Sequence, residues 1–296
     1  MASKNAMITI AGRPNVGKST LANMLAGEKV AIVTNKPQTT RNRIFAVVNR
    51  GDTQLVFVDT PGFHKARNKL GDYMVRVVND SVTDVDAVCL VVEPTPTVGT
   101  QETLLLEKLA GVGSPVVLVI NKIDSVKKEE LLAVIDVYRG AFDFADIVPI
   151  SARTGENVEE LLKVLETFAQ DGPQLFPEGM VTDQPEKQIC AEIIREKLLL
   201  CLEREIPHGT AVVIERFTER DSGIIDLEAV IYCEKQSHKG MIIGKHGAML
   251  KKIGAMARED IEEFMGTKVY LQTWVKVKEN WRDRDGLLKN FGFTDE

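Results

Sequence analysis

The feature that most limits how this chain can fold is the stretch GRPNVGKS, which runs from Gly12 to Ser19 directly after the apolar run Met7–Ile10. It matches the pattern GxxxxGK(S/T), and a helical pattern follows it. Its glycines let the backbone curl so that N–H groups point inward, and a helix that begins near Gly17 adds its positive end. A strand, loop and helix in this order predict a binding site for the phosphates of a nucleotide.

Individual residues of this loop have separable roles. Lys18 is expected to bring its charge to the β- and γ-phosphates, and the hydroxyl of Ser19 to ligate Mg²⁺. A glycine-rich turn formed by chance is the alternative, and the loop alone does not say which nucleotide binds. The residues expected to line the phosphate pocket are Gly12, Arg13, Pro14, Asn15, Val16, Gly17, Lys18, Ser19 and Thr20.

Two more polar stretches are expected to complete the phosphate site. Asp59, which follows the apolar run Leu55–Val58, can hold a water on the Mg²⁺, and the N–H of Gly62 can sense the γ-phosphate. In the stretch QTTR, Thr40 is preferred over Thr39 as the residue that caps the metal only while a γ-phosphate is bound. Both stretches are also ordinary turn sequences, which is the alternative interpretation. Together with the loop they predict a switch that responds to hydrolysis.

The stretch NKID is expected to select the base. Asp124 offers two acceptors that match the N1–H and the exocyclic N–H₂ of guanine, whereas adenine has no such pair of donors. Lys122 can lay its stem over the base, Asn121 belongs to the same motif, and the backbone of Ser151 and Ala152 can present an N–H to guanine O6. A helix N-cap beside a solvated lysine is the alternative for NKID alone. The motifs combined predict GTP and GDP with Mg²⁺ as ligands.

The order of apolar runs predicts the fold around these motifs. Runs of strand length alternate with segments of helical period as far as about Ala169, which implies right-handed crossovers and a mostly parallel, doubly wound sheet. Arg43–Asn49 departs from this order, since the turn at Gly51 makes it an antiparallel partner of Gln54–Val58. We predict an α/β P-loop domain over residues 1–170. Its parallel strands are expected at Met7–Ile10, Leu55–Val58, Ala87–Val92, Val116–Ile120 and Ile147–Ile150.

A second domain is predicted behind a linker. Residues 171–185 contain three prolines and two glycines without periodicity, which is typical of a linker. Residues 186–296 then follow the order α-β-β-α-α-β and predict an α+β domain with a C-terminal tail. Its elements are expected at Ile189–Leu202, Thr210–Phe217, Ile224–Cys233, two helices around Gly244–Gly247, and Val269–Lys278.

The turn GKHG, from Gly244 to Gly247, is a candidate RNA clamp because its glycines let a nucleic-acid backbone come close. From Lys235 to Arg258 the chain carries basic residues and no Asp or Glu. A helix–helix turn with a solvated basic face is the alternative, and the apolar residues of this region are equally compatible with core packing. The residues expected at the RNA are Lys239, Met241, Ile242, Ile243, Gly244, Lys245, His246, Gly247, Lys251 and Lys252.

With these motifs identified, the chain resembles a known family. The stretches GRPNVGKS, QTTR, DTPG, NKID and SA are similar to the motifs of the Era/TrmE-like GTPases. GKHG inside its α-β-β-α-α-β unit is similar to the turn of a type II KH domain, and one such domain behind one GTPase domain resembles the Era family over nearly the whole chain. The resemblance implies GTP hydrolysis in which Lys18, Thr40, Gly62 and Asn15 take part.

The resemblance also implies partners and a second cation. The RNA would be the single-stranded region near the 3′ end of small-subunit (16S) ribosomal RNA, and the role would be assembly of the small ribosomal subunit. Asn15 matches the loop asparagine that helps to hold K⁺ in potassium-dependent relatives, so K⁺ is an expected activating ion. Phe63 stands where Ras-type enzymes place a water-orienting glutamine, and the adjacent His64 is interpreted as an exposed loop residue.

Composition limits the remaining choices. The net charge of −6 argues against a protein that coats nucleic acid through its overall charge. The apolar runs are too short to span a bilayer, the first residues lack a signal-peptide pattern, and the four cysteines form no CxxC pair. We expect a cytoplasmic monomer, with peripheral association at the inner face of the membrane left open. Two other function classes stay open: an RNA-binding protein that holds GTP only as a structural ligand, and a signalling GTPase whose second domain binds protein.

Overall fold

The computed structural model describes residues 4–63 and 66–293. The chain divides into two compact units. The first consists of Met1–Ala31, Thr40–Lys65 and Met74–Asp183, and the second of Ile32–Thr39, Ala66–Tyr73 and Gln184–Glu296. Two short segments of the N-terminal half therefore belong to the C-terminal unit, which the sequence analysis did not predict.

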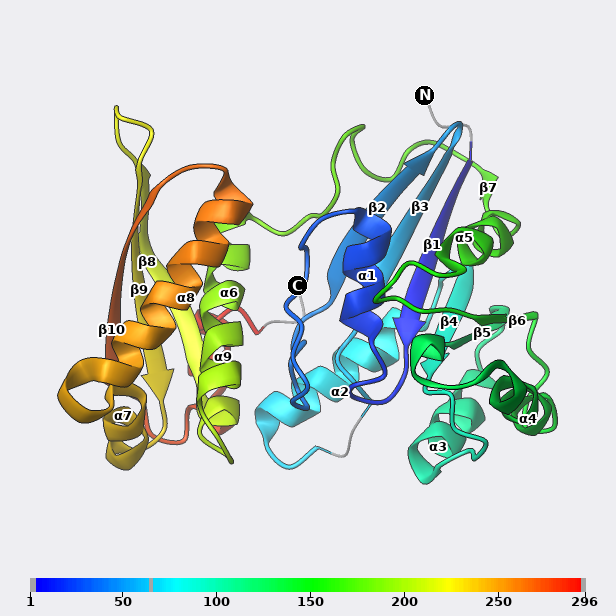
Figure 1. Ribbon diagram of the computed structural model, residues 1–296, viewed down its shortest axis with the longest axis horizontal. Coiled ribbons are helices and arrows are strands. Elements are labelled where there is room, and N and C mark those ends of the chain that lie inside the picture. The colour runs from blue at the N-terminus through cyan, green and yellow to red at the C-terminus, as the bar shows by residue number, and fades with distance from the viewer. Residues whose placement is uncertain (1–3, 64–65, 294–296) are drawn as a thin grey trace. The chain divides into compact units, whose positions relative to one another are not determined.

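The first unit is built on a sheet of seven strands among the described residues, in the order β2-β3-β1-β4-β5-β6 with β7 beside the start of β1 (Figure 1). β2 is antiparallel to β3, and the other neighbours in the series of six are parallel. This confirms the predicted mostly parallel sheet with an antiparallel edge. The strands are β1 (Lys4–Ala11), β2 (Ile44–Arg50), β3 (Thr53–Asp59), β4 (Ala87–Val92), β5 (Val116–Ile120), β6 (Asp146–Pro149) and β7 (Gln170–Asp171).

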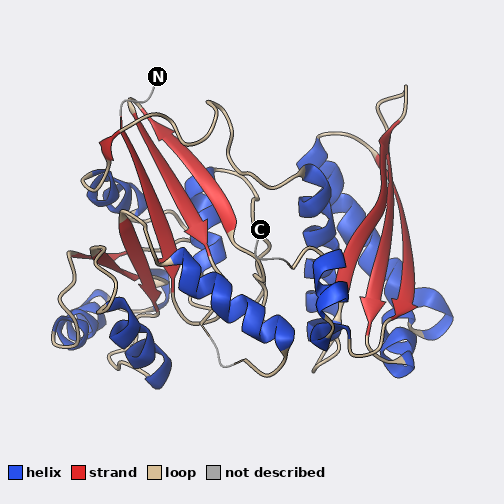
Figure 2. Ribbon diagram, turned by 180° about the vertical axis from the view of Figure 1, so that it is seen from behind, coloured by secondary structure: helices blue, strands red, loops and turns tan. Residues whose placement is uncertain are grey.

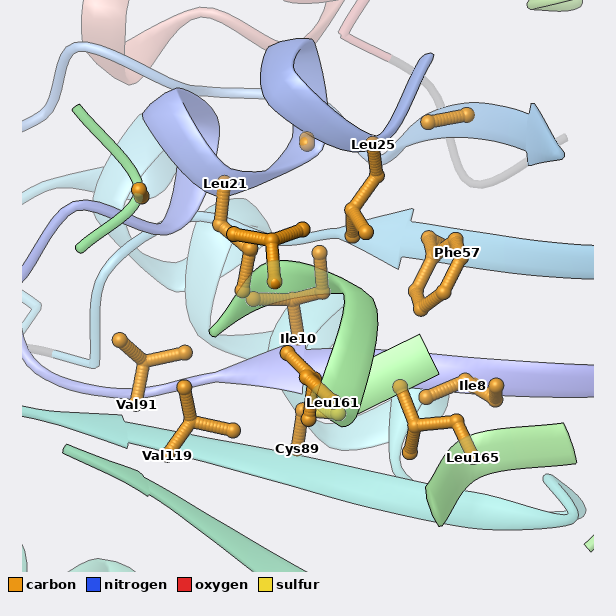
Figure 3. Packing of buried hydrophobic residues seen from close by; sticks show 14 of the residues in the cluster. Ile8, Ile10, Leu21, Leu25, Phe57, Cys89, Val91, Val119, Leu161 and Leu165 are labelled. Carbon is orange, nitrogen blue, oxygen red and sulfur yellow. The ribbon is translucent and has the colours of Figure 1, made fainter. Parts of the chain in front are cut away.

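Helices cover both faces of this sheet, because the buried strands send alternate residues into two cores. Cys89 and Val91 of β4 pack in one core, where Leu21 of α1 and Leu161 of α5 lie close to them (Figure 3). Leu90 of β4 packs in the other core, with α3 and α4. The helices are α1 (Lys18–Ala26), α2 (Lys69–Ser81), α3 (Thr100–Leu109), α4 (Lys128–Arg139) and α5 (Val158–Glu166). The part of α2 before Met74 belongs to the second unit.

The second unit contains a three-stranded sheet in the order β10-β9-β8, shown as red arrows in Figure 2. β8 is antiparallel and β10 parallel to β9, and the helices α6 and α8 share one core with the inner face of these strands. The α-β-β-α-α-β order is confirmed, and a further short helix follows it. The elements are α6 (Glu186–Cys201), β8 (Ala211–Glu219), β9 (Ile225–Cys233), α7 (Gln236–Ile243), α8 (Ala248–Met265), β10 (Val269–Val277) and α9 (Asp285–Asn290).

The stretch predicted as a linker lies largely within the first unit, which extends to Asp183. The side-chain oxygen of Gln54 on β3 accepts the N–H groups of Leu175 and Phe176 over 2.8 and 2.9 Å. The N–H of Val47 on β2 donates to the carbonyl of Val181 over 2.9 Å. These hydrogen bonds do not recur at a helical or strand period along the chain, so the sequence pattern did not indicate them.

All four cysteines are free thiols, and Cys89, Cys190 and Cys233 are buried. Burial raises the pKa of the Cys89 and Cys190 thiols to about 12, so both are protonated at neutral pH. Across residues 4–63 and 66–293, no helix combines the length and the apolarity that crossing a membrane requires.

Candidate nucleotide and nucleic-acid sites

The phosphate-binding loop joins the end of β1 to the start of α1, as predicted. Gly12 and Gly17 have φ angles of 152° and 99°. A Cβ on Gly12 would lie 2.5 Å from the carbonyl oxygen of Val91, and one on Gly17 would lie 2.3 Å from Asn121 Nδ2. Lys18 Nζ donates to the carbonyls of Gly12 and Arg13, each over 3.1 Å, so the loop curls around this ammonium group.

Lys18 and Asp59 form a buried pair of opposite charges. Asp59 is fully buried and Lys18 is 6% exposed. Burial lowers the pKa of Lys18 to about 8, with the Asp59 charge acting in the opposite direction. Burial likewise raises the pKa of Asp59 to about 6, against the charge of Lys18. Since desolvation outweighs the attraction in both groups, an anion at Lys18 and a cation at Asp59 would each stabilise this site.

Three oxygen-bearing side chains meet beside this pair. Ser19 Oγ lies 2.7 Å from Asp59 Oδ2 and 2.8 Å from Thr40 Oγ1, and Thr40 Oγ1 lies 3.5 Å from the same carboxylate oxygen. Asp59 Oδ1 is buried and has no hydrogen-bond partner among the described residues. Hydroxyl and carboxylate oxygens are the donors that Mg²⁺ prefers, so this set fits that ion. The hydroxyl of Thr39 instead bonds to the carbonyl of Lys36 over 2.7 Å.

The loop after β3 approaches the phosphate-binding loop closely. A Cβ on Gly62 would lie 2.8 Å from the Pro14 backbone. The N–H of Phe63 donates to the carbonyl of Gly12 over 3.2 Å. Only glycine fits at position 62 without a shift of the neighbouring loop, which agrees with a role that depends on close approach. His64 lies outside the described residues.

Asn121 joins three loops at the carboxyl ends of the strands. Its side chain is almost completely buried. Nδ2 donates to the carbonyl of Val16 over 2.8 Å, and Oδ1 accepts the N–H groups of Lys122 and Ala152 over 2.8 and 2.9 Å. Lys122 Nζ then reaches the carbonyl of Asn15 over 2.7 Å. Asn121 therefore holds the base-binding loops against the phosphate loop, and the Ala152 N–H expected at guanine O6 is used inside the protein.

Asp124 is held as a charged acceptor. Ser151 Oγ donates to Asp124 Oδ1 over 2.6 Å, and Arg153 pairs with Oδ2. The Ser151 hydrogen bond and the Arg153 charge keep the pKa of Asp124 below its usual value. The carboxylate is thus ionised at neutral pH, as the recognition of two guanine N–H groups requires. The backbone N–H of Ser151 donates to the carbonyl of Glu156 over 3.0 Å.

An acidic cluster that was not among the predicted site residues braces the nucleotide loops. Glu93 directly follows β4 and pairs with both Arg13 and Lys122. Glu102 on α3 accepts from Arg13 Nε over 2.6 Å. An acidic residue at the carboxyl end of a buried parallel strand was the available signal, since this edge of the sheet also holds the other nucleotide motifs.

The GKHG turn lies between α7 and α8, and three of its four residues have positive φ. Gly244, His246 and Gly247 have φ angles of 73°, 51° and 78°. A Cβ on Gly244 would lie 2.7 Å from Met249 Cβ, whereas one on Gly247 would meet no atom within 4 Å. Gly244 is therefore required for packing, and Gly247 keeps open the space in front of the turn.

A groove of about 490 Å³ lies beside this turn. Of the predicted RNA contacts, only Gly247 and Lys251 line it. Ile242 is fully buried in the core, while Met241 is exposed. Lys245, His246 and Lys252 are exposed near the turn. The groove residues that the sequence analysis did not predict are Leu250, Gly254, Ala255, Arg258, Leu271 and Thr273.

Comparisons with known proteins agree with this geometry. A family model described as 50S ribosome-binding GTPase matches residues 7–122, and one described as KH domain matches residues 205–282. The GTPase Era of Clostridium kluyveri is 52% identical over 290 residues, covering 98% of this chain and 99% of the relative. The GTPase Era of Clostridioides difficile is 50% identical over 295 residues and covers 99% of both chains.

A solved structure matches both units. It is a crystal structure of Era in complex with MgGDPNP and nucleotides 1506–1542 of 16S ribosomal RNA. The TM-score is 0.94 with 36% sequence identity, and the match covers 98% of this chain and 99% of the other.

Proposed function

Because this chain belongs to the Era family of GTPases, we propose that it hydrolyses GTP with Mg²⁺, binds small-subunit ribosomal RNA near its 3′ end and uses the nucleotide as a switch during assembly of the small ribosomal subunit. The relative whose structure matches both units was crystallised with MgGDPNP and a segment of 16S ribosomal RNA. The proposal assigns the equivalent ligands to this chain.

One observation carries the nucleotide part of the proposal. Lys18 and Asp59 are buried as a charged pair, and the hydroxyls of Ser19 and Thr40 lie against the same carboxylate. Burying such charges has a free-energy cost that a nucleotide phosphate and a divalent cation would offset. A pocket of this kind agrees with a ligand that carries both. A site that is complete for both phosphate and metal also argues against an RNA-binding protein that holds GTP only as a structural ligand.

The side chains suggest a division of labour. Lys18 would stabilise negative charge at the β- and γ-phosphates, and Ser19, Thr40 and Asp59 would hold Mg²⁺, Asp59 through a water. When bound, Mg²⁺ supplies further neutralisation of phosphate charge. The Gly62 N–H would donate to the γ-phosphate.

The position after Gly62 is occupied by Phe63, whose side chain packs partly against a core of the first unit. It has no polar group to orient a water, which favours slow intrinsic hydrolysis. We propose that K⁺ held near Asn15 contributes the missing charge stabilisation. Turnover is expected to be higher in KCl than in matched NaCl, and equal rates in the two salts would refute this part.

The RNA part rests on the groove beside GKHG. Its floor is apolar and its rim carries Lys251 and Arg258, a combination suited to unpaired bases on one side and phosphates on the other. A second domain that binds protein would not need a basic rim. Salt-sensitive binding of a single strand would therefore favour RNA over protein as the partner.

Two experiments test the function. Calorimetry on nucleotide-free protein is expected to detect binding of GDP and of GTP but not of ATP, and no heat with either guanine nucleotide would refute the site. A short single-stranded oligonucleotide from the rRNA 3′ end is expected to bind more tightly with a GTP analogue than with GDP. Equal affinities would contradict nucleotide control while leaving GTP hydrolysis intact.

We further propose a monomer that acts in the cytoplasm. Association with the inner face of a membrane is the open alternative, and the net charge of −6 does not favour attraction to anionic lipid. Cosedimentation with vesicles of anionic and of zwitterionic lipid would test it, and the sedimentation of the free protein would give its oligomeric state.

A further inference from the structure

One of the boundaries between the two compact units lies between Thr39 and Thr40, next to the proposed metal site. Thr40 belongs to the first unit, and its hydroxyl lies beside Ser19 and Asp59. Thr39 belongs to the second unit, as does the whole segment Ile32–Thr39. The hydroxyl proposed to sense the γ-phosphate is therefore joined directly to a segment that is part of the RNA-binding unit.

Three consecutive charged residues of α6, in the second unit, are almost completely buried. Arg195, Glu196 and Lys197 are only 1%, 4% and 6% exposed. Three buried charges in a row are costly unless each has partners, so the contacts that they make are informative. Lys197 pairs within the helical layer, with Glu196 over 2.9 Å and with Asp260.

The other two charged residues hold the segment Ile32–Thr39. Glu196 Oε1 accepts the N–H of Val33 over 3.0 Å. Arg195 Nη2 donates to the carbonyl of Thr39. A third bond runs from Lys36 Nζ to the carbonyl of Leu202, just beyond α6. The segment is thus tied to α6 near its start, at its middle and at its end.

The bond between Arg195 and the Thr39 carbonyl, at the end of the segment, bears directly on the position of Thr40. Arg195 is oriented by Glu192, whose Oε1 accepts from Arg195 Nε over 2.8 Å. Nη1 of Arg195 has no hydrogen-bond partner among the described residues. Among the described residues, Glu192 and the Thr39 carbonyl are therefore the hydrogen-bond partners that offset the free-energy cost of burying this guanidinium. Because the contact is to a backbone carbonyl, it fixes the path of the chain into Thr40.

The second inserted segment, Ala66–Tyr73, is held by contacts of a different kind. The Lys69 N–H donates to Asp283 Oδ1 over 3.2 Å, and the buried Tyr73 ring meets the Phe293 ring with centroids 6.0 Å apart. Its ion pair between Lys69 and Asp285 joins side chains that are 50% and 78% exposed. Water and salt screen such a pair strongly. Of the two segments, Ile32–Thr39 is the one whose backbone is held by buried charged side chains in the described part of the chain.

We propose that Arg195 is a positioning residue for Thr40: by holding the Thr39 carbonyl it sets where the Thr40 hydroxyl can go, and so couples α6 of the RNA-binding unit to the state of the nucleotide. This inference rests on the proposed role of Thr40 at the Mg²⁺ and γ-phosphate. Since that role exists only while a γ-phosphate is present, Arg195 stabilises the GTP complex selectively. Coupling free energies are reciprocal, so GTP in turn restrains α6.

The test compares two buried cations on the same helix. Arg195→Met removes the bond to Thr39, and Lys197→Met removes a similarly buried charge whose ion pairs are with Glu196 and Asp260. Thr40→Ala is the positive control. For each folded variant, the dissociation constants of a fluorescent non-hydrolysable GTP analogue and of fluorescent GDP are measured with Mg²⁺, and kcat and KM for GTP are measured separately.

For Arg195→Met we expect affinity for the GTP analogue to fall about 5- to 20-fold with affinity for GDP changed less than about twofold, the selectivity that a lost coupling produces. Lys197→Met should change both affinities by the same small factor. Arg195→Lys should recover part of the selectivity, because lysine can donate one bond to the carbonyl. If Arg195→Met does not fold, the loss of affinity for the GTP analogue relative to the loss for GDP is measured in Arg195→Lys, and a loss equal for both nucleotides overturns the inference.

Equal losses for GTP analogue and GDP in Arg195→Met, or a ratio equal to that of Lys197→Met, would overturn the inference and leave Arg195 as a structural residue of α6. An unchanged GTP-analogue affinity in Thr40→Ala would overturn the proposed role of Thr40 as well. A selective loss in Thr40→Ala without one in Arg195→Met would overturn the inference alone.

Discussion

The two regions proposed to bind phosphate differ in how exposed their charged side chains are. In the first unit, the charges that face phosphate and metal are buried: Lys18 and Asp59 have almost no exposed surface. In the second, the exposed Lys251 and Arg258 line an open groove, and Lys245 is exposed at the turn beside it. One site uses a few buried charges, and the other uses several exposed ones.

Burial makes a charge more selective for its partner. A buried charge interacts strongly, is little affected by salt and leaves a large penalty when its partner is missing. Exposed lysines each contribute little and are screened, which suits a long polyanion that is bound through many weak contacts. The comparison predicts a ranking of mutational effects.

Removing the buried ammonium group should have the largest effect. We expect Lys18→Met to lower kcat/KM for GTP by ~10³-fold, since a preorganised charge at the developing negative charge is lost. The loss should be nearly the same at low and at high salt, because the group is buried. Steady-state phosphate release at two ionic strengths checks this, with the exposed Lys128→Met as the control. A loss that disappears at high salt would place Lys18 with the exposed charges.

Removing the buried carboxylate should stabilise the nucleotide-free protein. Burial raises the pKa of Asp59 from 3.8 to about 6. The folded state therefore binds the proton more tightly than the unfolded state, and stability falls as pH rises from about 4 to about 6. Each pH unit between the two pKa values corresponds to 1.36 kcal/mol of unfolding free energy. Part of this gain is lost because the variant leaves Lys18 without its charged partner. We therefore expect Asp59→Asn to raise the free energy of unfolding by about 1–2 kcal/mol at pH 7.

Urea unfolding of the metal-free and nucleotide-free protein measures this gain. It should be full above about pH 6 and should vanish near pH 4, where Asp59 is protonated in both states of the wild type. The same variant should lose Mg²⁺-dependent hydrolysis. A gain that stays constant with pH would show that the ionisation of Asp59 is not its cause.

A single negative charge at the exposed turn should weaken RNA binding by a smaller factor. Gly247→Asp and Gly247→Asn both fit the open space and both tolerate the left-handed backbone, so they differ mainly in charge. We expect roughly a tenfold loss of oligonucleotide affinity for Asp and little for Asn, with GTP hydrolysis unchanged in both. Position 247 is a cleaner test than 244, where any side chain meets Met249. Equal losses in the two variants would point to backbone strain.

Removing one groove lysine should have the smallest effect. Lys251→Met, at the groove, is expected to lower RNA affinity about threefold at low salt and to reduce the slope of log K against log salt by roughly 1. Lys252→Met, on the same helix but outside the groove lining, serves as the matched control. Fluorescence anisotropy over a salt series gives both numbers. An effect that is independent of salt would contradict the assignment of Lys251 to a phosphate contact.

Much of the nucleotide site could be predicted because each of its motifs is short and local. Gly12 and Gly17 have the unusual backbone that their spacing indicated, and the structure brings Ser19, Thr40 and Asp59 together. The partners that brace them were not predicted. Glu93 and Glu102 carry no motif, and their link to Arg13 depends on how β4 and α3 pack.

The RNA groove shows a different limit. Helical period alone places Ile242 near the turn, but only the packed domain decides that it points into the core. The small residues Gly254 and Ala255 line the groove because α8 lies beside β10. A one-dimensional pattern says which residues share a face, and it does not say which neighbouring element leaves a gap over that face.

The order of elements, the phosphate loop and the guanine motif follow from the sequence alone, because strand and helix periods and glycine conformations act over a few residues. That Ile32–Thr39 belongs to the second unit, while Thr40 does not, depends on the folded structure. Arg195 and Glu196 of α6 are buried charges that need partners, and long-range packing supplied these partners from the backbone of Ile32–Thr39.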